Sequence, residues 1–252
     1  MKRRLFLLKL SVVALALIFG NVAYSQMGAS TPGGGNAILA KLFGETKAFS
    51  AKCDVQILRP GQQEPLSVTT DFALLDGKMR TEMDMSKLAS AQMPPNAVAS
   101  MKQMGMDQVV TVVRPDTKAL LLVYPKIKSC VNLPLPDADV EALAKKTKIE
   151  KTKLAEEKID GHPCIKNKTI VTEENGRTSE FTLWNATDMK DFPIQIKTTD
   201  RGSQVTMQYK DIQFAKPDAK LFNAPDGYKQ YKDMQTFIQT VMAKMYGGTV
   251  PK

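Results

Sequence analysis

The stretch EKIDGHPCIKNKTIV, residues 157–171, contains the only histidine of the chain, His162, two residues after Asp160 and two before Cys164. A carboxylate, an imidazole and a thiol this close together could bind a metal ion or activate the thiol as a nucleophile. A metal site would need two or three more ligands, and the chain has no second histidine. A nucleophilic thiol would need a third group to orient the histidine ring.

The same residues also fit a turn. Asp160 and Gly161 form a turn signal, and Pro163 restricts the backbone where the next strand begins. We therefore expect His162 to be a turn residue, with no metal, no cofactor and no catalytic role. The chain has no HEXXH, GXSXG or CXXC motif and no glycine-rich phosphate loop. A pair of carboxylates brought together by folding stays open as an enzymatic alternative.

The N-terminus predicts export. Residues 1–25 combine four basic residues with a short apolar run and small residues at Ala23 and Ser25, which predicts a signal peptide cleaved before Gln26. A transmembrane anchor is the alternative. Removing 25 of 252 residues leaves 227, enough for one domain with its own core. The net charge falls from +9 to +5 as the four basic residues leave, and no motif predicts nucleic-acid binding. Weak contact with an anionic membrane surface stays open.

After the predicted signal peptide, the sequence predicts a short helix and then a series of strands that two helical stretches interrupt. Residues 26–35 are a flexible leader, and residues 36–47 predict a short helix. Residues 49–57, 66–74 and 79–85 alternate apolar and polar side chains, and Asp76-Gly77 predicts a tight hairpin between the last two. Residues 86–106 predict a helical excursion that is rich in methionine. Further strands are expected at 109–114, 119–133 (bent at Pro125), 164–173, 178–184, 192–198 and 204–214, with a bulge near Lys210-Asp211, and a helix at about 136–148.

This order predicts an α+β fold that is mainly antiparallel β. We expect a strongly curved sheet, or an unclosed β-barrel, with helices over its concave face. Residues 36–228 would form one such domain. Residues 229–252 would form an amphipathic helix and a tail, because apolar residues recur at helical spacing up to Tyr246 and Gly247-Gly248 ends the pattern.

Three cysteines in an exported chain suggest one disulfide and one free thiol. Cys53 shares a strand face with apolar residues and is expected to be reduced and buried. Cys130 and Cys164 each share a face with lysines, which makes them poor core residues. We therefore predict a Cys130–Cys164 disulfide, with the other pairings open.

Several motifs occur in an order that resembles the superfamily of LolA and LolB, periplasmic lipoprotein-sorting proteins, and its uncharacterised relatives. They are IDGHPC before a lysine-rich strand (159–164), FTLW (181–184), FPIQI (192–196) and LFNAPDGY (221–228). The resemblance covers most of the predicted mature chain. It implies an unclosed β-barrel with helices as a lid over an apolar cavity that holds acyl chains. The helix expected over residues 229–246 lies beyond that pattern, and the arginine inside the cavity of the carriers has no matching position here.

Seven methionines fall between positions 79 and 106, and methionine suits surfaces that adapt to apolar partners. Ordinary core filling is the alternative. We expect a non-enzymatic periplasmic or secreted protein that binds an apolar ligand, a lipid or a lipoprotein acyl chain. A sensor or scaffold that grips a protein partner through the same surface is the second hypothesis. The expected ligand-binding residues are Leu66, Val68, Phe72, Leu74, Met79, Met83 and Met85 on the hairpin and Met93, Met101 and Met104 on the excursion.

Overall fold

The computed structural model describes residues 35–87, 95–136, 140, 147–200 and 202–246. Its main element is one twelve-stranded sheet, in the order β12-β6-β5-β4-β3-β2-β1-β11-β10-β9-β8-β7. The strands are β1 (Ala48–Leu58), β2 (Leu66–Leu75), β3 (Lys78–Asp84), β4 (Gln108–Arg114), β5 (Ala119–Tyr124), β6 (Ser129–Pro134), β7 (Thr147–Ile159), β8 (His162–Glu173), β9 (Thr178–Ala186), β10 (Phe192–Asp200), β11 (Ser203–Gln213) and β12 (Lys229–Tyr231).

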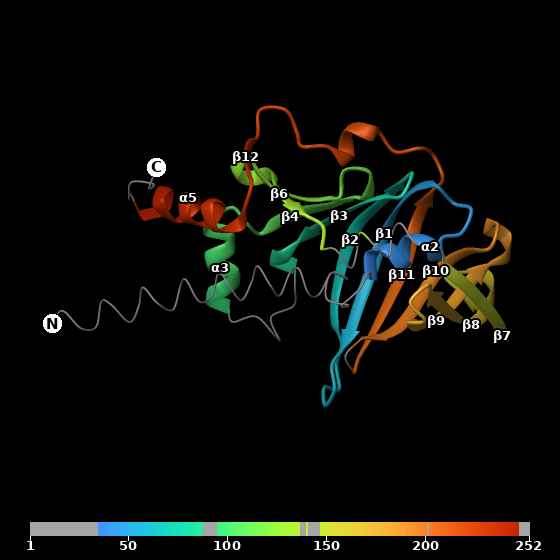
Figure 1. Cartoon of the computed structure of the whole chain (residues 1–252). Helices are drawn as coiled ribbons and strands as arrows, with labels where there is room; N and C mark the ends of the chain where they lie inside the picture. The colour runs from blue at the N-terminus through green and yellow to red at the C-terminus, as the bar shows by residue number, and fades with distance from the viewer. Residues whose placement is uncertain (1–34, 88–94, 137–139, 141–146, 201, 247–252) are drawn as a thin grey trace.

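Neighbouring strands pair antiparallel, except for β12 and β6, which run parallel. The helices are α2 (Gly35–Leu42), α3 (Pro95–Gln103) and α5 (Met234–Tyr246), with short 3-10 helices η2 (Met85–Lys87), η3 (Pro115–Thr117), η4 (Pro125–Ile127), η5 (Thr187–Met189) and η6 (Ala219–Phe222). The sheet is strongly curved and does not close (Figure 1). The expected fold class, an unclosed antiparallel barrel with helices, is confirmed.

Two apolar layers lie on opposite faces of the sheet. On the concave face, Phe43, which follows α2, contacts rings from four strands: Phe49 of β1, Phe72 of β2, Phe192 of β10 and Tyr209 of β11. Ring centroids in these pairs are 4.8–5.9 Å apart. The sheet therefore wraps around one aromatic cluster, which is the centre of the main core.

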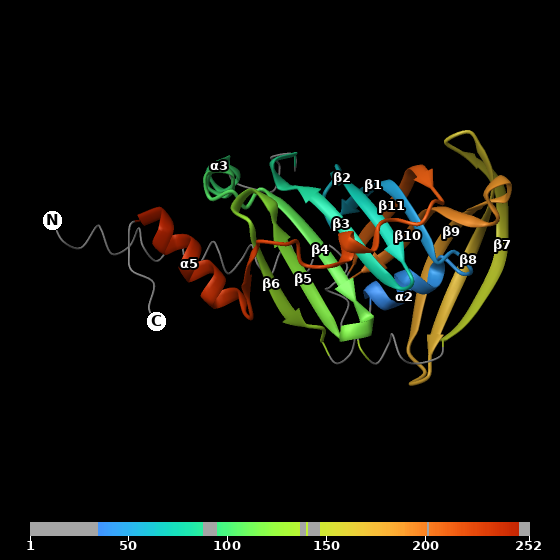
Figure 2. The same ribbon diagram turned by 90° about the horizontal axis from the view of Figure 1, so that it is seen from above.

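The convex face has a smaller apolar cluster. Residues 214–228, the crossing segment, lead from β11 across this face to β12 (Figure 2). Phe222 in this segment packs against side chains of β2, β4, β5 and β6. Strands β4 and β5 are therefore covered on both faces, which explains why all six residues of β5 are buried.

Several predicted elements differ from the structure. The first helix ends at Leu42, and Gly44, at a φ of +57°, begins the turn into β1. The bent strand expected over 119–133 is two paired strands, β5 and β6, because η4 turns the chain at Pro125. The helix expected at about 136–148 overlaps the start of β7, and residues 137–139 and 141–146 lie outside the described residues. The C-terminal helix begins at Met234, after the short strand β12.

Candidate functional site

His162 lies at the hairpin between β7 and β8. Asp160 and Gly161 have φ angles of +50° and +88° and connect β7 to β8, and His162 is the first residue of β8. Its Nδ1 lies 2.8 Å from Oδ2 of Asp188, and its side chain is 38% exposed. The Cys164 thiol donates to the His162 backbone carbonyl at 3.4 Å and not to the ring. The expected turn is present at Asp160 and Gly161, and His162 is not part of it but begins the strand that follows. Within the described residues, no group of three or more His, Cys, Asp or Glu side chains is arranged to hold a metal ion.

The predicted disulfide is wrong for this structure, because all three cysteines are free and buried. Cys130 lies on β6 in the convex cluster and Cys164 lies on β8 in the concave core, with eight strands between them in the sheet order. The parity argument failed at Cys130 because Lys126 and Lys128 belong to η4 and its end, not to the strand. Burial raises the pKa of all three thiols, and that of Cys53 to about 12. Cys53 is reduced and buried, as predicted.

The hairpin residues expected to bind ligand share the concave face. Leu74 pairs with Met79, and Thr70 with Met83, so side chains of β2 and β3 point to the same side. All seven predicted hairpin residues are buried in the main core: Leu66, Val68, Phe72, Leu74, Met79, Met83 and Met85. They thus line the floor beneath the helices. Their role in ligand binding stays a prediction.

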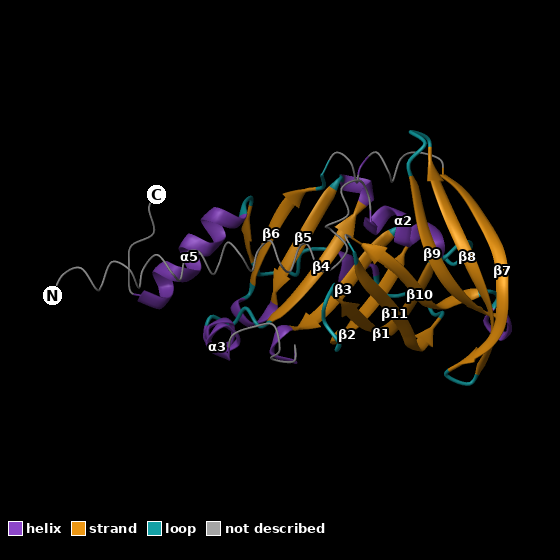
Figure 3. Cartoon of the chain, turned by 90° about the horizontal axis from the view of Figure 1, so that it is seen from below, coloured by secondary structure: helices purple, strands orange, loops and turns teal. Residues whose placement is uncertain are grey.

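The predicted lid differs in position. The element that contacts Phe72 is the end of α2, through Phe43, while α3 lies beside α5 at the β6 end of the sheet (Figure 3). Met101 and Met104 of this excursion are half-buried against the main core, and Met93 lies outside the described residues. The described part of the excursion after Met93, from Pro95 to Met106, therefore borders the concave face at its β6 end.

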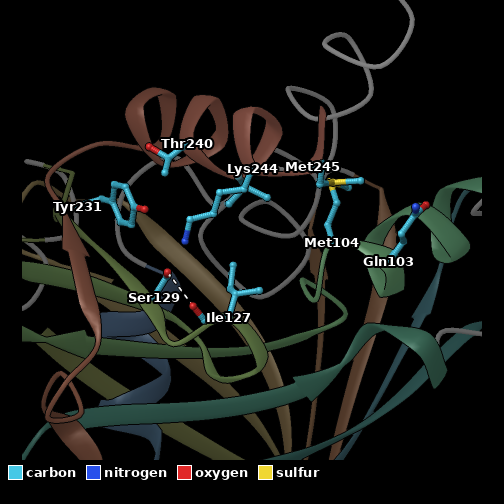
Figure 4. Close-up of a pocket in the computed structure, with 9 residues that line it drawn as sticks. Gln103, Met104, Ile127, Ser129, Tyr231, Thr240, Lys244 and Met245 are labelled. Carbon is cyan, nitrogen blue, oxygen red and sulfur yellow. Dashed lines mark hydrogen bonds between the residues drawn. The ribbon is translucent and has the colours of Figure 1, made fainter. Parts of the chain in front are cut away.

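A pocket of about 280 Å³ opens between α3, α5 and the sheet (Figure 4). Its walls come from three regions: the end of α3, the η4–β6 segment with β12, and the inner face of α5. The lining residues are Gln103, Met104, Ile127, Ser129, Tyr231, Thr240, Val241, Lys244 and Met245.

The position of α5 depends on local features around its first turn. Asp233 caps the helix, because its carboxylate accepts from the Thr236 backbone N–H at 2.7 Å and from the Thr236 hydroxyl at 2.9 Å. Phe237, fully buried, stacks on Tyr124 with centroids 4.7 Å apart and meets Tyr231 edge-on at 5.3 Å. These contacts hold the start of α5 against the edge of the sheet, so that its later turns overhang the pocket.

Sequence reasoning found one lining residue of this pocket, Met104, and missed the other eight. It missed them because β12 and α5 were predicted as a single helix, which hides the position of Tyr231 in the sheet. The sequence did contain a signal: Asp233 followed three residues later by Thr236 is a helix start that would have moved the boundary.

No protein-family profile matches this chain, and no curated protein does. Solved structures do. A LolA superfamily protein from Nitrosomonas europaea has 10% identity over 73% of this chain and 93% of its own, at a TM-score of 0.34. A putative outer membrane lipoprotein-sorting protein domain from Vibrio parahaemolyticus has 13% identity over 74% of this chain and 94% of its own, at a TM-score of 0.35. The lipoprotein LppX from Mycobacterium tuberculosis has 12% identity over 71% of this chain and 91% of its own, at a TM-score of 0.37. The names of the first two structures include the group that the sequence motifs resemble.

Proposed function

We propose that the protein is a non-enzymatic, exported binding protein that holds an apolar ligand, a lipid or lipoprotein acyl chain, between its helices and the concave face of the sheet. The observation that carries this proposal is the pocket of about 280 Å³ under α5, next to the main apolar core. Tyr231 and Val241 belong to that core, and Met104 and Ile127 pack against it. A chain that enters the pocket therefore meets apolar side chains continuous with the concave face.

The pocket walls can adapt to a ligand. Met104 and Met245 come from two different helices, and methionine has three flexible torsions and a polarizable sulfur. The volume lies near the lower limit of about 300 Å³ for small-molecule sites, so it suits part of one chain. A longer chain would have to reach the floor lined by Phe72, Met79 and Met83.

Burial gives an estimate of the affinity. Each buried methylene contributes about 0.8 kcal/mol, so ten give about 8 kcal/mol before the cost of association, which takes at least about 4 kcal/mol. The remainder corresponds to a Kd near the millimolar range for ten buried carbons, and each two further carbons tighten it by roughly an order of magnitude. A sixteen-carbon probe is therefore the appropriate choice.

Residues 1–25 are predicted to be a cleaved signal peptide, so in this proposal the protein acts in the periplasm or outside the cell. In this proposal a membrane is the source of the ligand, met by peripheral contact. The second hypothesis, a sensor or scaffold for a protein partner, uses the same surface.

The test is titration with a fluorescent sixteen-carbon fatty acid and with two variants. Met104→Asp, in the half-buried pocket wall, should weaken binding at least tenfold, because its carboxylate would lose water without gaining a partner. Leu221→Asp, exposed at 46% on the crossing segment, is the control and should bind like the wild type. Met83→Asp, if far-UV circular dichroism shows it folded, tests the floor. Normal binding by Met83→Asp would confine the ligand to the pocket, and no binding by the wild type would favour the protein-partner hypothesis.

A further inference from the structure

Two polar groups, one from α5 and one from β12, point into the pocket. The Lys244 side chain descends from α5, and its amino group and the Tyr231 hydroxyl point toward the same space (Figure 4). Among the described residues, Lys244 has no ion pair and the Tyr231 hydroxyl has no hydrogen-bond partner. Both groups can donate a hydrogen bond, and an ammonium only donates.

The other hydroxyls of the pocket have already used their protons. Ser129 Oγ donates to the Ile127 carbonyl at 3.1 Å, and Thr240 Oγ1 donates to the Thr236 carbonyl at 2.8 Å. These two hydroxyls can therefore only accept a hydrogen bond from a ligand. Three lining side chains keep a donor among the described residues: Lys244, Tyr231 and the amide of Gln103, which lies at the other side of the pocket from the first two (Figure 4). None of the nine lining residues is acidic. The polar end of the pocket therefore favours an acceptor that carries negative charge.

We propose that Lys244 and Tyr231 form a head-group site for the carboxylate of a single-chain fatty acid, whose tail lies along Met104, Ile127 and Val241. This inference rests on the proposed function and adds the chemistry of the ligand to it. A carboxylate has two acceptor oxygens, one for each donor. A pocket of about 280 Å³ has room for part of one chain, which favours a ligand with a single chain.

The site is specific to the C-terminal segment. Tyr231 is held by β12, which pairs with Ser129–Val131 of β6, while Lys244 is on the third turn of α5. The two donors converge because α5 turns back over the strand that precedes it. Lys229, whose amino group lies 5.0 Å from the Tyr231 ring centroid, is not itself one of the nine residues that line the pocket.

The experiment compares dodecanoate, dodecanol and dodecyl phosphate by isothermal titration calorimetry at pH 7.5 on the full chain. The tails are identical, so the difference in Kd measures the head group. We expect dodecanoate to bind about fivefold more tightly than dodecanol, the gain from one partly exposed charge pair. Lys244→Gln should abolish this preference, so that the ratio of the Kd for dodecanol to the Kd for dodecanoate falls to about one. Tyr231→Phe should reduce the preference without abolishing it.

Lys220→Gln is the matched control, since it removes the same charge from an exposed position on the crossing segment. It should behave as the wild type, and Lys244→Arg should keep the preference. Equal affinity of the wild type for acid and alcohol, or a preference that survives Lys244→Gln, would overturn the head-group site while the proposed function stands. Tighter binding of dodecyl phosphate than of dodecanoate would overturn the carboxylate assignment. Binding of none of the three would refute the proposed function itself.

Discussion

Phe222 gives the most direct test of how the C-terminal segment is attached. Its side chain is 1% exposed and packs on the convex face in a cluster that includes Val112, Leu121 and Cys130. Truncation to alanine removes a buried ring and leaves a cavity, which costs about 3–5 kcal/mol. That is a large part of the 5–15 kcal/mol typical of a folded domain. At about 2–4 °C per kcal/mol for a chain of this size, Tm should fall by roughly 12 °C.

The assay is urea unfolding with a thermal scan, and the neighbouring residue supplies the control. Leu221 is 46% exposed, so Leu221→Ala should change the unfolding free energy by less than about 0.5 kcal/mol. The two variants differ by one position and test burial alone. If Phe222→Ala unfolds within about 1 kcal/mol of the wild type, the crossing segment is not packed on the sheet as described. The segment leads directly into β12 and α5, so the same variant should also weaken the fatty-acid probe.

Three further predictions follow from particular contacts. All cysteines should resist Ellman's reagent in the native protein, because burial raises their pKa, and all three should react in guanidinium without reductant; fewer would indicate a disulfide. The Glu157 carboxylate accepts a hydrogen bond from the Trp184 indole at 2.6 Å, and its pKa is lowered first by Lys166 and then by this bond. The stability that this carboxylate contributes is therefore present above its pKa in the unfolded chain and is lost as the pH falls through its lower pKa in the folded chain. Tryptophan fluorescence should accordingly shift at a pH below the usual glutamate range, and this shift should be absent in Glu157→Gln. Gly105→Ala should cost more than Gly161→Ala: both have positive φ, but the added Cβ at Gly105 would lie 2.8 Å from Ile127 Cγ2, while that at Gly161 meets nothing within 4 Å; equal losses of unfolding free energy would contradict the clash.

Local signals predicted the parts of the fold that depend on local conformation. Asp76 and Gly77 were expected to form a tight hairpin, and their φ angles are +49° and +82°. A bulge was expected near Lys210-Asp211, where the apolar parity of the strand changes. The register of β11 against β1 shifts there, and Asp211 has a φ of +51°. Both features follow from a few adjacent residues, which is why the sequence alone is sufficient.

Strand β7 was missed for a different reason. It is the edge strand of the sheet, and most of its residues are exposed on both faces, including Leu154 at 55%. A strand without a buried face has no period of two, and its lysines and glutamates resemble a helix surface. Its charges and the register shift next to Leu154 are typical of edges that avoid pairing with another chain. Its pairing with β8 across the Asp160-Gly161 turn identifies it.

The pocket shows why the site was harder to predict than the fold. Its residues come from segments around positions 104, 128, 231 and 242, and nothing in their spacing brings them together. What does so is the crossing segment, which carries the chain over the convex face to the free edge of β6. There a strand of three residues is enough to pair the edge and turn the chain, and α5 then returns over the concave side. Phe237 anchors the first turn of α5, while Lys244 and Met245 lie beyond that anchor. Of the lining residues on α5, Thr240 and Val241 are buried against the sheet, while Lys244 is exposed and Met245 half-buried. In the proposed function, the last turn of α5 is therefore the part that would adapt to a ligand.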